Sequence, residues 1–258
     1  MEPFILPLQP VLAFLIVLAR VGGIVSFAPF WAHKSVSVQI RVLIAFVISL
    51  VLTPALSNSI VTPPTEVFPF GLVILGELLV GVMLGIVGRI VFSAFEFAAH
   101  FFVNHMGFAL AGIVDPETKA HSSAFGIGAQ MLALVAMLGA NGHHWFLIAA
   151  YRSFERIPPG GFALSQNGLD ILLRLSASAI SVGLSIAAPA VIVLVVMEFG
   201  LEFFGRTAPQ FQIFVLGFPL KIGVGLFVLG SSLYFLPAAF RDVIGGILVN
   251  LDKLLGTF

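Results

Sequence analysis

The sequence predicts an all-α integral membrane protein built of helical hairpins. Of its 258 residues, 59% are hydrophobic and only 9% are charged, and the mean hydropathy is +1.13. A soluble domain carries about 25% charged residues, so this composition is typical of a chain embedded in a membrane. The apolar runs are continuous and about twice as long as the ~10-residue alternating segments of a barrel, which favours helices. We expect one membrane-type domain over residues 1–258.

About six apolar helical segments follow one another along this domain. They are expected near residues 11–30, 42–56, 70–103, 124–151, 172–204 and 219–236. The first ends at Trp31, a typical interfacial residue, and because no basic segment precedes it we expect a retained span rather than a signal peptide. The third is longer than the ~20 residues of one bilayer crossing. The fourth, interrupted at Asn141-Gly142-His143, is either one bent helix or two shorter ones.

Charges and glycines within the apolar runs predict surfaces that contact protein. A charge near mid-bilayer costs at least ~2.5 kcal/mol, so we expect Glu77, Arg89 and Glu96 to face other helices or water. Arg20, in the middle of the first run, is a further candidate for a buried charge. Gly81 and Gly85 share one face of the third helix, where a neighbouring backbone can approach closely. Alternatively, these glycines only reflect the frequency of glycine in membrane helices.

The stretch Arg206–Lys221 is apolar but is interrupted by amides and helix breakers. Pro209 and Pro219 each lack an N–H and crowd the preceding turn, so we expect a turn and irregular backbone between the last two long helices. Irregular apolar backbone near a membrane must be buried in protein or line a cavity. The candidate packing residues here are Arg206, Pro209, Gln210, Gly217, Pro219 and Lys221.

A second irregular stretch, residues 104–123, follows the third helix. It mixes glycines with apolar side chains and closes at Asp115-Pro116, a turn signal. It is either the frayed end of the third helix or a loop that folds into a cavity and blocks it. The candidate plug residues are Met106, Gly107, Phe108, Leu110, Gly112, Ile113, Val114, Asp115 and Pro116.

No pattern in the sequence predicts an enzyme, a cofactor or a metal site. His100 and His105 lie five apart rather than at the four-residue spacing that converges on one ion. The chain has no Gly-x-Ser-x-Gly elbow, no phosphate-binding loop and no cysteine. The net charge of zero gives no argument for nucleic acid as a partner.

Two functions remain open on the residues alone. Ionisable residues in proline-interrupted helices are typical of a proton- or ion-coupled secondary transporter. These residues are Arg20, Glu77, Arg89, Glu198, Glu202 and Lys221. A transporter is expected to show two halves of matching pattern, and no convincing repeat is present. The other function is a channel or a component of a multi-subunit membrane complex.

Several short motifs follow one another along nearly the whole chain. They are Arg20 with Ala28-Pro29 and Ser35-Val36, Gly76-Glu77 with Gly81 and Gly85, Met106-Gly107 with Val114-Asp115-Pro116, Asn141-Gly142-His143, Pro159-Gly160-Gly161, and RTAPQFQIFVLGFPLK at Arg206–Lys221. Their joint order resembles the FliR family, the export-gate proteins of flagellar type III secretion and their virulence-secretion relatives. The chain departs from the family pattern at Ser37, His105 and Gln212, where proline, glutamine and asparagine or serine are common.

The resemblance implies one copy of this chain in a helical export gate with FliP-like and FliQ-like subunits. FlhB-like and FlhA-like export components would be neighbours, and unfolded flagellar proteins would pass through the centre. Such a gate would sit in the bacterial inner membrane at the flagellar basal body, in contact with lipid. The loop from Met106 to His121 would then act as its plug.

Overall fold

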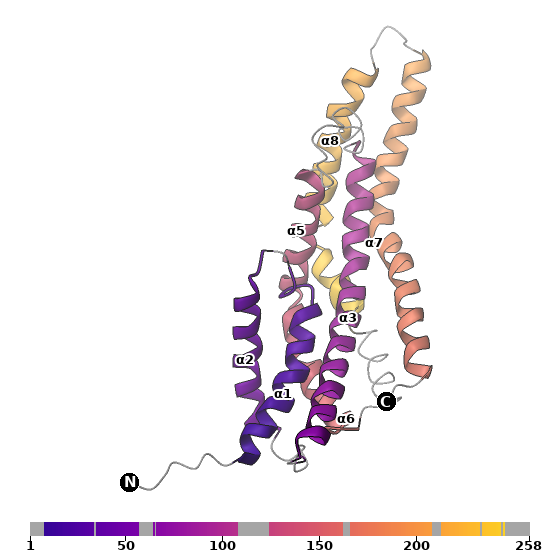
Figure 1. Cartoon of the computed structure of the whole chain (residues 1–258). Helices are drawn as coiled ribbons and strands as arrows, with labels where there is room; N and C mark the ends of the chain where they lie inside the picture. Colours follow the sequence, from indigo (N-terminus) through magenta and orange to yellow (C-terminus); the bar gives the residue numbers. More distant parts are fainter. Residues whose placement is uncertain are drawn as a thin grey trace, which may run out of the picture. The chain divides into compact units, whose positions relative to one another are not determined.

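The structure, a computed structural model, describes residues 8–33, 35–56, 64, 66–107, 124–161, 166–207, 213–232, 234–243 and 245. Its helices are α1 (Leu8–Phe27), α2 (Val38–Ala55), α3 (Val67–His105), α5 (Ala124–Gly139), α6 (Gly142–Arg156), α7 (Gln166–Thr207) and α8 (Ile213–Ser232), shown in Figure 1. A short helix, Leu236–Val243, follows α8. The predicted all-α class is confirmed.

The chain packs into two compact units that interleave along the sequence. Unit 1 comprises Met1–Ile90, His143–Leu175 and Gly245–Phe258. Unit 2 comprises Val91–Gly142 and Ser176–Ile244. Both α3 and α7 therefore contribute residues to each unit.

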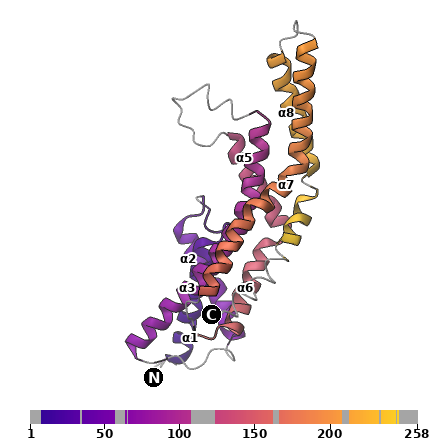
Figure 2. The same ribbon diagram turned by 90° about the vertical axis from the view of Figure 1, so that its right-hand side faces the viewer.

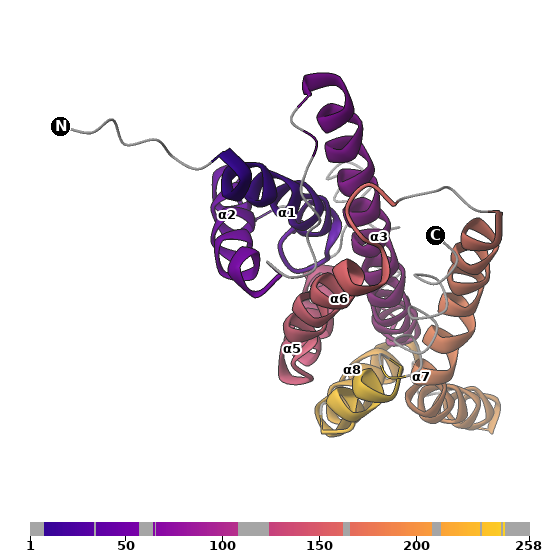
Figure 3. The same cartoon turned by 90° about the horizontal axis from the view of Figure 1, so that it is seen from below.

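In unit 1, α1 and α2 form a helical hairpin whose members lie side by side (Figures 1 and 3). Ser37 begins α2 as its N-cap, and its hydroxyl accepts a hydrogen bond from the backbone N–H of Ile40. Such a cap satisfies one of the N–H groups that a helix start leaves without a partner. The hairpin is held by a buried apolar cluster of Ile16, Val17, Val21, Val25, Ala45, Leu56 and Phe154.

In unit 2, α7 and α8 form a second hairpin, which can be followed in Figures 1 and 2. The core of this unit joins the end of α3 to α5 and α7. Its buried members are Ala98, Phe102, Val103, Met106, Ala129, Ala187, Val191 and Leu194. Three of these eight residues are alanines, and small side chains allow helices to pack closely.

Four of the described helices are long and apolar enough to cross a membrane. They are Leu8–Phe27, Val38–Ala55, Val67–His105 and Leu172–Thr207, and two pairs of shorter helices raise the number to six if each pair is one span. The predicted interruption of the fourth segment occurs at Asn141, which separates α5 from α6 with φ of 59°. Asparagine is one of the few side chains that visit this left-handed region readily.

The helix boundaries differ from the predicted ones mainly at the starts. For example, α1 begins at Leu8 rather than near residue 11, and α7 begins at Gln166 rather than near residue 172. The apolar run alone does not mark these starts, because the N–H groups of a first turn need no partner within the helix and polar residues fit there.

The expectation of irregular backbone up to Lys221 is wrong. The helix α8 begins at Ile213 and continues through Pro219 to Ser232. Pro219 removes one backbone donor, but helices in membranes tolerate proline because neighbouring groups satisfy the freed carbonyl. Pro209 and Gln210 lie outside the described residues.

Candidate functional site

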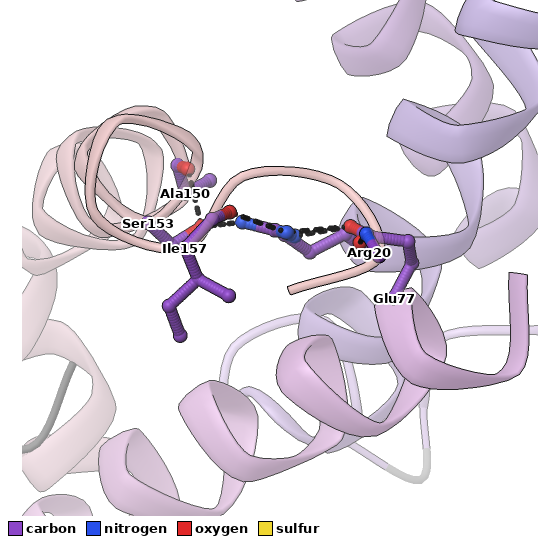
Figure 4. A network of polar contacts seen from close by, with 6 residues as sticks. Arg20, Glu77, Ala150, Ser153 and Ile157 are labelled. Atoms are coloured by element: carbon purple, nitrogen blue, oxygen red, sulfur yellow. Dashed lines mark hydrogen bonds and ion pairs between the residues drawn. The ribbon is translucent and has the colours of Figure 1, made fainter. Parts of the chain in front are cut away.

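A buried ion pair joins α1 to α3 in unit 1. Arg20 lies in the middle of α1 and Glu77 in α3, and both side chains have 0% of their surface exposed. The Nε and Nη2 atoms of Arg20 each lie 2.6 Å from Oε2 of Glu77. Figure 4 shows this pair together with Ser153 of α6 and Ile157, which directly follows that helix. Arg20 and Glu77, which the sequence indicated as two separate candidates for a buried charge, therefore face each other.

The guanidinium of Arg20 also contacts the end of α6. Its Nη1 donates to the hydroxyl of Ser153 over 3.1 Å, and Nη2 donates to the backbone carbonyl of Ile157 over 3.0 Å. The guanidinium carbon lies 3.9 Å above the ring of Phe154, a cation–π contact. A cation at a helix C-terminus satisfies carbonyls that have no partner within the helix. Arg20 therefore acts as a cap of α6.

The second carboxylate oxygen of Glu77 holds the connector that follows α6. The backbone N–H of Gly160 donates to Oε1 of Glu77 over 3.2 Å. Gly160 has φ of +81°, in the region that only glycine adopts freely. Arg20 and Glu77 thus fix both the carbonyl of Ile157 and the N–H of Gly160. We refer to Arg20, Glu77, Ser153, Ile157 and Gly160 as the polar centre.

Glycines bring the backbones of α1 and α3 together beside the polar centre. A Cβ atom added to Gly81 would overlap the backbone carbonyl of Arg20, and one added to Gly23 would lie 2.7 Å from the carbonyl oxygen of Leu78. A Cβ atom on Gly85 would lie 2.7 Å from the Cβ of Phe27. This close approach allows the short side chain of Glu77 to reach Arg20. Gly23 was missed from the sequence, although its place three residues after Arg20 was a usable signal.

Met106 and Gly107, the first two candidate plug residues, lie at the end of α3 in unit 2. The side chain of Met106 is 1% exposed and packs onto Gly225 of α8, where an added Cβ would lie 2.6 Å from the methionine Cε. Gly107 has φ of 93° and its N–H donates to the carbonyl of Asn104, which ends the helix. The other candidates lie outside the described residues: Phe108, Leu110, Gly112, Ile113, Val114, Asp115 and Pro116.

The remaining candidates in the part of the chain that the structure describes lie outside the polar centre. Lys221 of α8 lies 2.6 Å from Glu198 of α7, a pair within unit 2 whose carboxylate side chain is 46% exposed. Arg89 and Arg206 are exposed, Gly217 is buried and Pro219 is exposed on α8. The Lys221–Glu198 pair is partly exposed to solvent, so breaking it should cost less than removing one partner of the fully buried Arg20–Glu77 pair.

The polar centre is suited to holding helices together rather than to chemistry on a substrate. Its charged atoms are buried and bound to one another, which leaves no exposed nucleophile or proton carrier within it. Among the described residues, no group of three or more histidines and carboxylates is placed to hold a metal ion. Ser153 and the carbonyl of Ile157 were not found from the sequence, because neither differs in type or spacing from ordinary helix residues.

Comparison with known proteins shows which family this chain resembles. Residues 11–247 match the model of bacterial export proteins, family 1. The flagellar biosynthetic protein FliR of Escherichia coli (strain K12) is 30% identical over 214 residues, which are 83% of this chain and 81% of the relative. FliR of Bacillus subtilis (strain 168) is 29% identical over 94% of each chain, and that of Caulobacter vibrioides is 26% identical over 88% of this chain and 90% of the relative.

These matches confirm the resemblance drawn from the motifs, and they cover most of the chain. The apolar helices agree with a membrane protein of an export apparatus, and the family is not one of enzymes. The chain belongs to the FliR family, family 1 of the bacterial export proteins.

Proposed function

We propose that this chain is a core subunit of a flagellar type III export gate in the bacterial inner membrane, at the flagellar basal body. One copy assembles with FliP-like and FliQ-like subunits into a gated channel for unfolded flagellar proteins. FlhB-like and FlhA-like components are its neighbours in the export apparatus. The observation that carries the proposal is the family match over residues 11–247, which covers unit 2 and most of unit 1.

The exposed surface of α2 supports a role within an assembly. Adjacent residues such as Val42 and Leu43, and again Leu50 and Val51, are exposed on this helix. Successive residues of a helix point about 100° apart, so the exposed apolar surface covers more than one side of α2. Such a helix fits a position between lipid and other subunits. An ordinary amphipathic helix of a soluble bundle exposes polar residues there.

The transporter alternative is weakened by how the ionisable residues are used. A coupled carrier needs charged groups that can meet a substrate or an ion near the middle of the membrane. Arg20 and Glu77 are instead buried and bound to each other, and Lys221 is paired with Glu198.

We expect the tagged protein, co-expressed with its neighbouring genes and purified in mild detergent, to have the native mass of a large complex. That complex should hold one copy of this chain and two other kinds of hydrophobic subunit. The measurement is native mass spectrometry, with the chain expressed alone as the control. A lone monomer or homodimer from the co-expressed sample would contradict the proposal and favour the alternative function as a secondary transporter.

We also propose that the loop from Met106 to His121 closes the gate at rest. Met106 is anchored in the core of unit 2, and the positive φ of Gly107 redirects the chain as α3 ends. Apolar side chains beyond this point would exclude water and ions from the passage.

Deleting Gly107–Gly112 is expected to make cells permeable to small ions, because the deletion removes apolar bulk from the closed passage. Ion leakage is measured in cells that produce the assembled complex. Phe108→Leu, which keeps an apolar side chain, serves as the control, and cells that carry it should not leak ions. Unchanged permeability and normal secretion in the deletion variant would exclude the plug role.

A further inference from the structure

The α1–α2 hairpin of unit 1 carries a second guanidinium, that of Arg41 in the first turn of α2. Its Nη2 donates to the backbone carbonyl of His33 over 2.9 Å, while its Nε is buried and has no hydrogen-bond partner. Arg20, on the same hairpin, is paired with Glu77, but Arg41 forms no ion pair with any residue that the structure describes. The charge of Arg41 is therefore partly buried without a counter-ion.

The sequence around the hairpin offers this charge no carboxylate. Between Glu2 and Glu66 the chain contains no acidic residue at all, and none stands in the first turn of α2. Arg41 also lies at the positive end of the helix dipole, where a cation is unfavourable and an anion is favoured. A partly buried charge without a partner is costly, so these features together favour an anion from outside the chain.

Further hydrogen-bond donors lie in the segment that Arg41 contacts. The backbone N–H of Ser35 donates to Nδ1 of His33 over 3.3 Å, which leaves the ring proton of that histidine on Nε2 as a donor. The first N–H groups of α2 have no acceptor within the helix, and the hydroxyl of Ser37 caps that of Ile40. A phosphate accepts several such bonds at once, and the planar fork of an arginine suits it well.

The position of Arg41 along the hairpin matches the depth of lipid phosphates. Both α1 and α2 are long enough to cross a membrane, and the 18 residues of α2 measure about 27 Å, close to the ~30 Å of a hydrocarbon core. The connector joins the two helices at one end of the hairpin (Figure 1). Trp31 lies in this connector, with its ring centroid 5.7 Å from that of Phe146, and tryptophan is enriched at membrane interfaces.

The outer side of α2 offers a place for acyl chains beside Arg41. Only Ala45 and Ser49 of this helix are buried. Three apolar residues spaced four apart follow one another on the outside: Val38, Val42 and Phe46, which are 70%, 62% and 45% exposed. A lipid therefore satisfies both the charge and the apolar strip. A carboxylate of a neighbouring helix would meet only the charge, and its own desolvation would add a cost.

We propose that Arg41, with the side chain of His33 and the first turn of α2, binds the phosphate of an anionic phospholipid. Its acyl chains lie along the strip of Val38, Val42 and Phe46. A net negative charge is needed, because a zwitterionic lipid already holds a cation beside its phosphate. The inference requires only a membrane around α2, so it does not depend on the export-gate proposal.

Tryptophan fluorescence of the full chain in detergent tests this site. The chain has two tryptophans, and Trp145→Phe leaves Trp31, two residues from His33, as the single fluorophore. The protein is titrated with phosphatidylglycerol or with phosphatidylcholine, both carrying brominated acyl chains that quench tryptophan. We expect half-maximal quenching at an about tenfold lower fraction of phosphatidylglycerol, the preference that ~1.4 kcal/mol of binding free energy gives. Equal quenching by the two lipids would overturn the inference.

Substitutions in the Trp145→Phe background assign the preference to one residue. Arg41→Gln is expected to make the two quenching curves coincide, whereas Arg41→Lys, which keeps the charge but loses the fork, should keep part of the preference. Arg241→Gln is the matched control, because it removes the same charge from an exposed arginine of unit 2. A tenfold preference that persists in Arg41→Gln, or one that disappears in Arg241→Gln, would contradict the site.

Two further outcomes identify a different anion. If inorganic phosphate displaces brominated phosphatidylglycerol at the concentration at which the lipid binds, the site takes a free ion and the acyl chains play no part. If Arg41→Gln lowers the yield of the co-expressed complex but leaves the lipid preference unchanged, the partner of Arg41 is a carboxylate of another subunit. Either result would exclude the lipid site. The absence of any complex would contradict the export gate alone, because the lipid titration uses this chain by itself.

Discussion

Replacing Arg20 with leucine is expected to lower the free energy of unfolding of the detergent-purified protein by about 3–5 kcal/mol. The substitution leaves the carboxylate of Glu77 buried without its cation and removes the donors to Ser153 and the Ile157 carbonyl. A buried charge that loses its partner keeps its desolvation cost, which explains the size of the effect. Equilibrium unfolding in denaturant, with the amount of protein in the membrane as a second readout, measures it.

The double variant Arg20→Leu with Glu77→Leu is the informative control. Because both charges are then absent, it should be more stable than Arg20→Leu alone, as found when buried pairs are replaced together. Arg20→Lys keeps the charge but not the fork of donors, and should fall between the original chain and Arg20→Leu. If Arg20→Leu lowers the free energy of unfolding by less than about 1 kcal/mol, the range of exposed ion pairs, the proposed stabilising role of the polar centre is contradicted.

Gly81→Ala is expected to lower the free energy of unfolding by about 1–3 kcal/mol, the usual cost of overpacking. The new methyl group would overlap the backbone carbonyl of Arg20, which cannot move aside as a flexible side chain would. The separation of α1 from α3 should increase, and the ion pair beside it should weaken. The same denaturant measurement applies, with the Arg20→Leu variant as a reference.

Gly22→Ala in α1 is the matched control for the close packing. An added Cβ at Gly22 meets nothing within 4 Å, so alanine should stabilise the helix by up to about 1 kcal/mol through its higher helix propensity. The two substitutions should thus change the free energy of unfolding in opposite directions, although both lie in the same pair of helices. Equal effects of Gly81→Ala and Gly22→Ala would show that α1 and α3 do not touch at Gly81.

The helices could be predicted well because each long apolar run has only one stable form in a membrane. Backbone groups in hydrocarbon must bond within their own segment, which makes helix the default for every such run. Proline was one source of error, since Pro219 is a helix breaker in soluble proteins but lies inside α8. The break at Asn141 was visible in the sequence, but its form was decided by the left-handed backbone at this one residue.

The polar centre could be predicted only in part. Arg20 and Glu77 were identifiable one at a time, because each is costly in lipid. Their pairing was not, since they are 57 positions apart and the contact depends on how α1 crosses α3. The carbonyl of Ile157 and the N–H of Gly160 are backbone groups, which nearly every residue has. Their part in the polar centre could therefore not be predicted from residue type, because it depends on how the connector folds.

The order in which the polar centre can form has a consequence for biogenesis. Glu77 lies 57 residues after Arg20, and Ile157 lies 137 residues after it. At a synthesis rate of about 5–20 residues per second, Glu77 follows Arg20 after about 3 to 11 s and Ile157 after about 7 to 27 s. The first helix thus leaves the ribosome with a guanidinium that has none of these partners yet. It depends on water or on the insertion machinery to shelter that charge until more than half of the chain has been made.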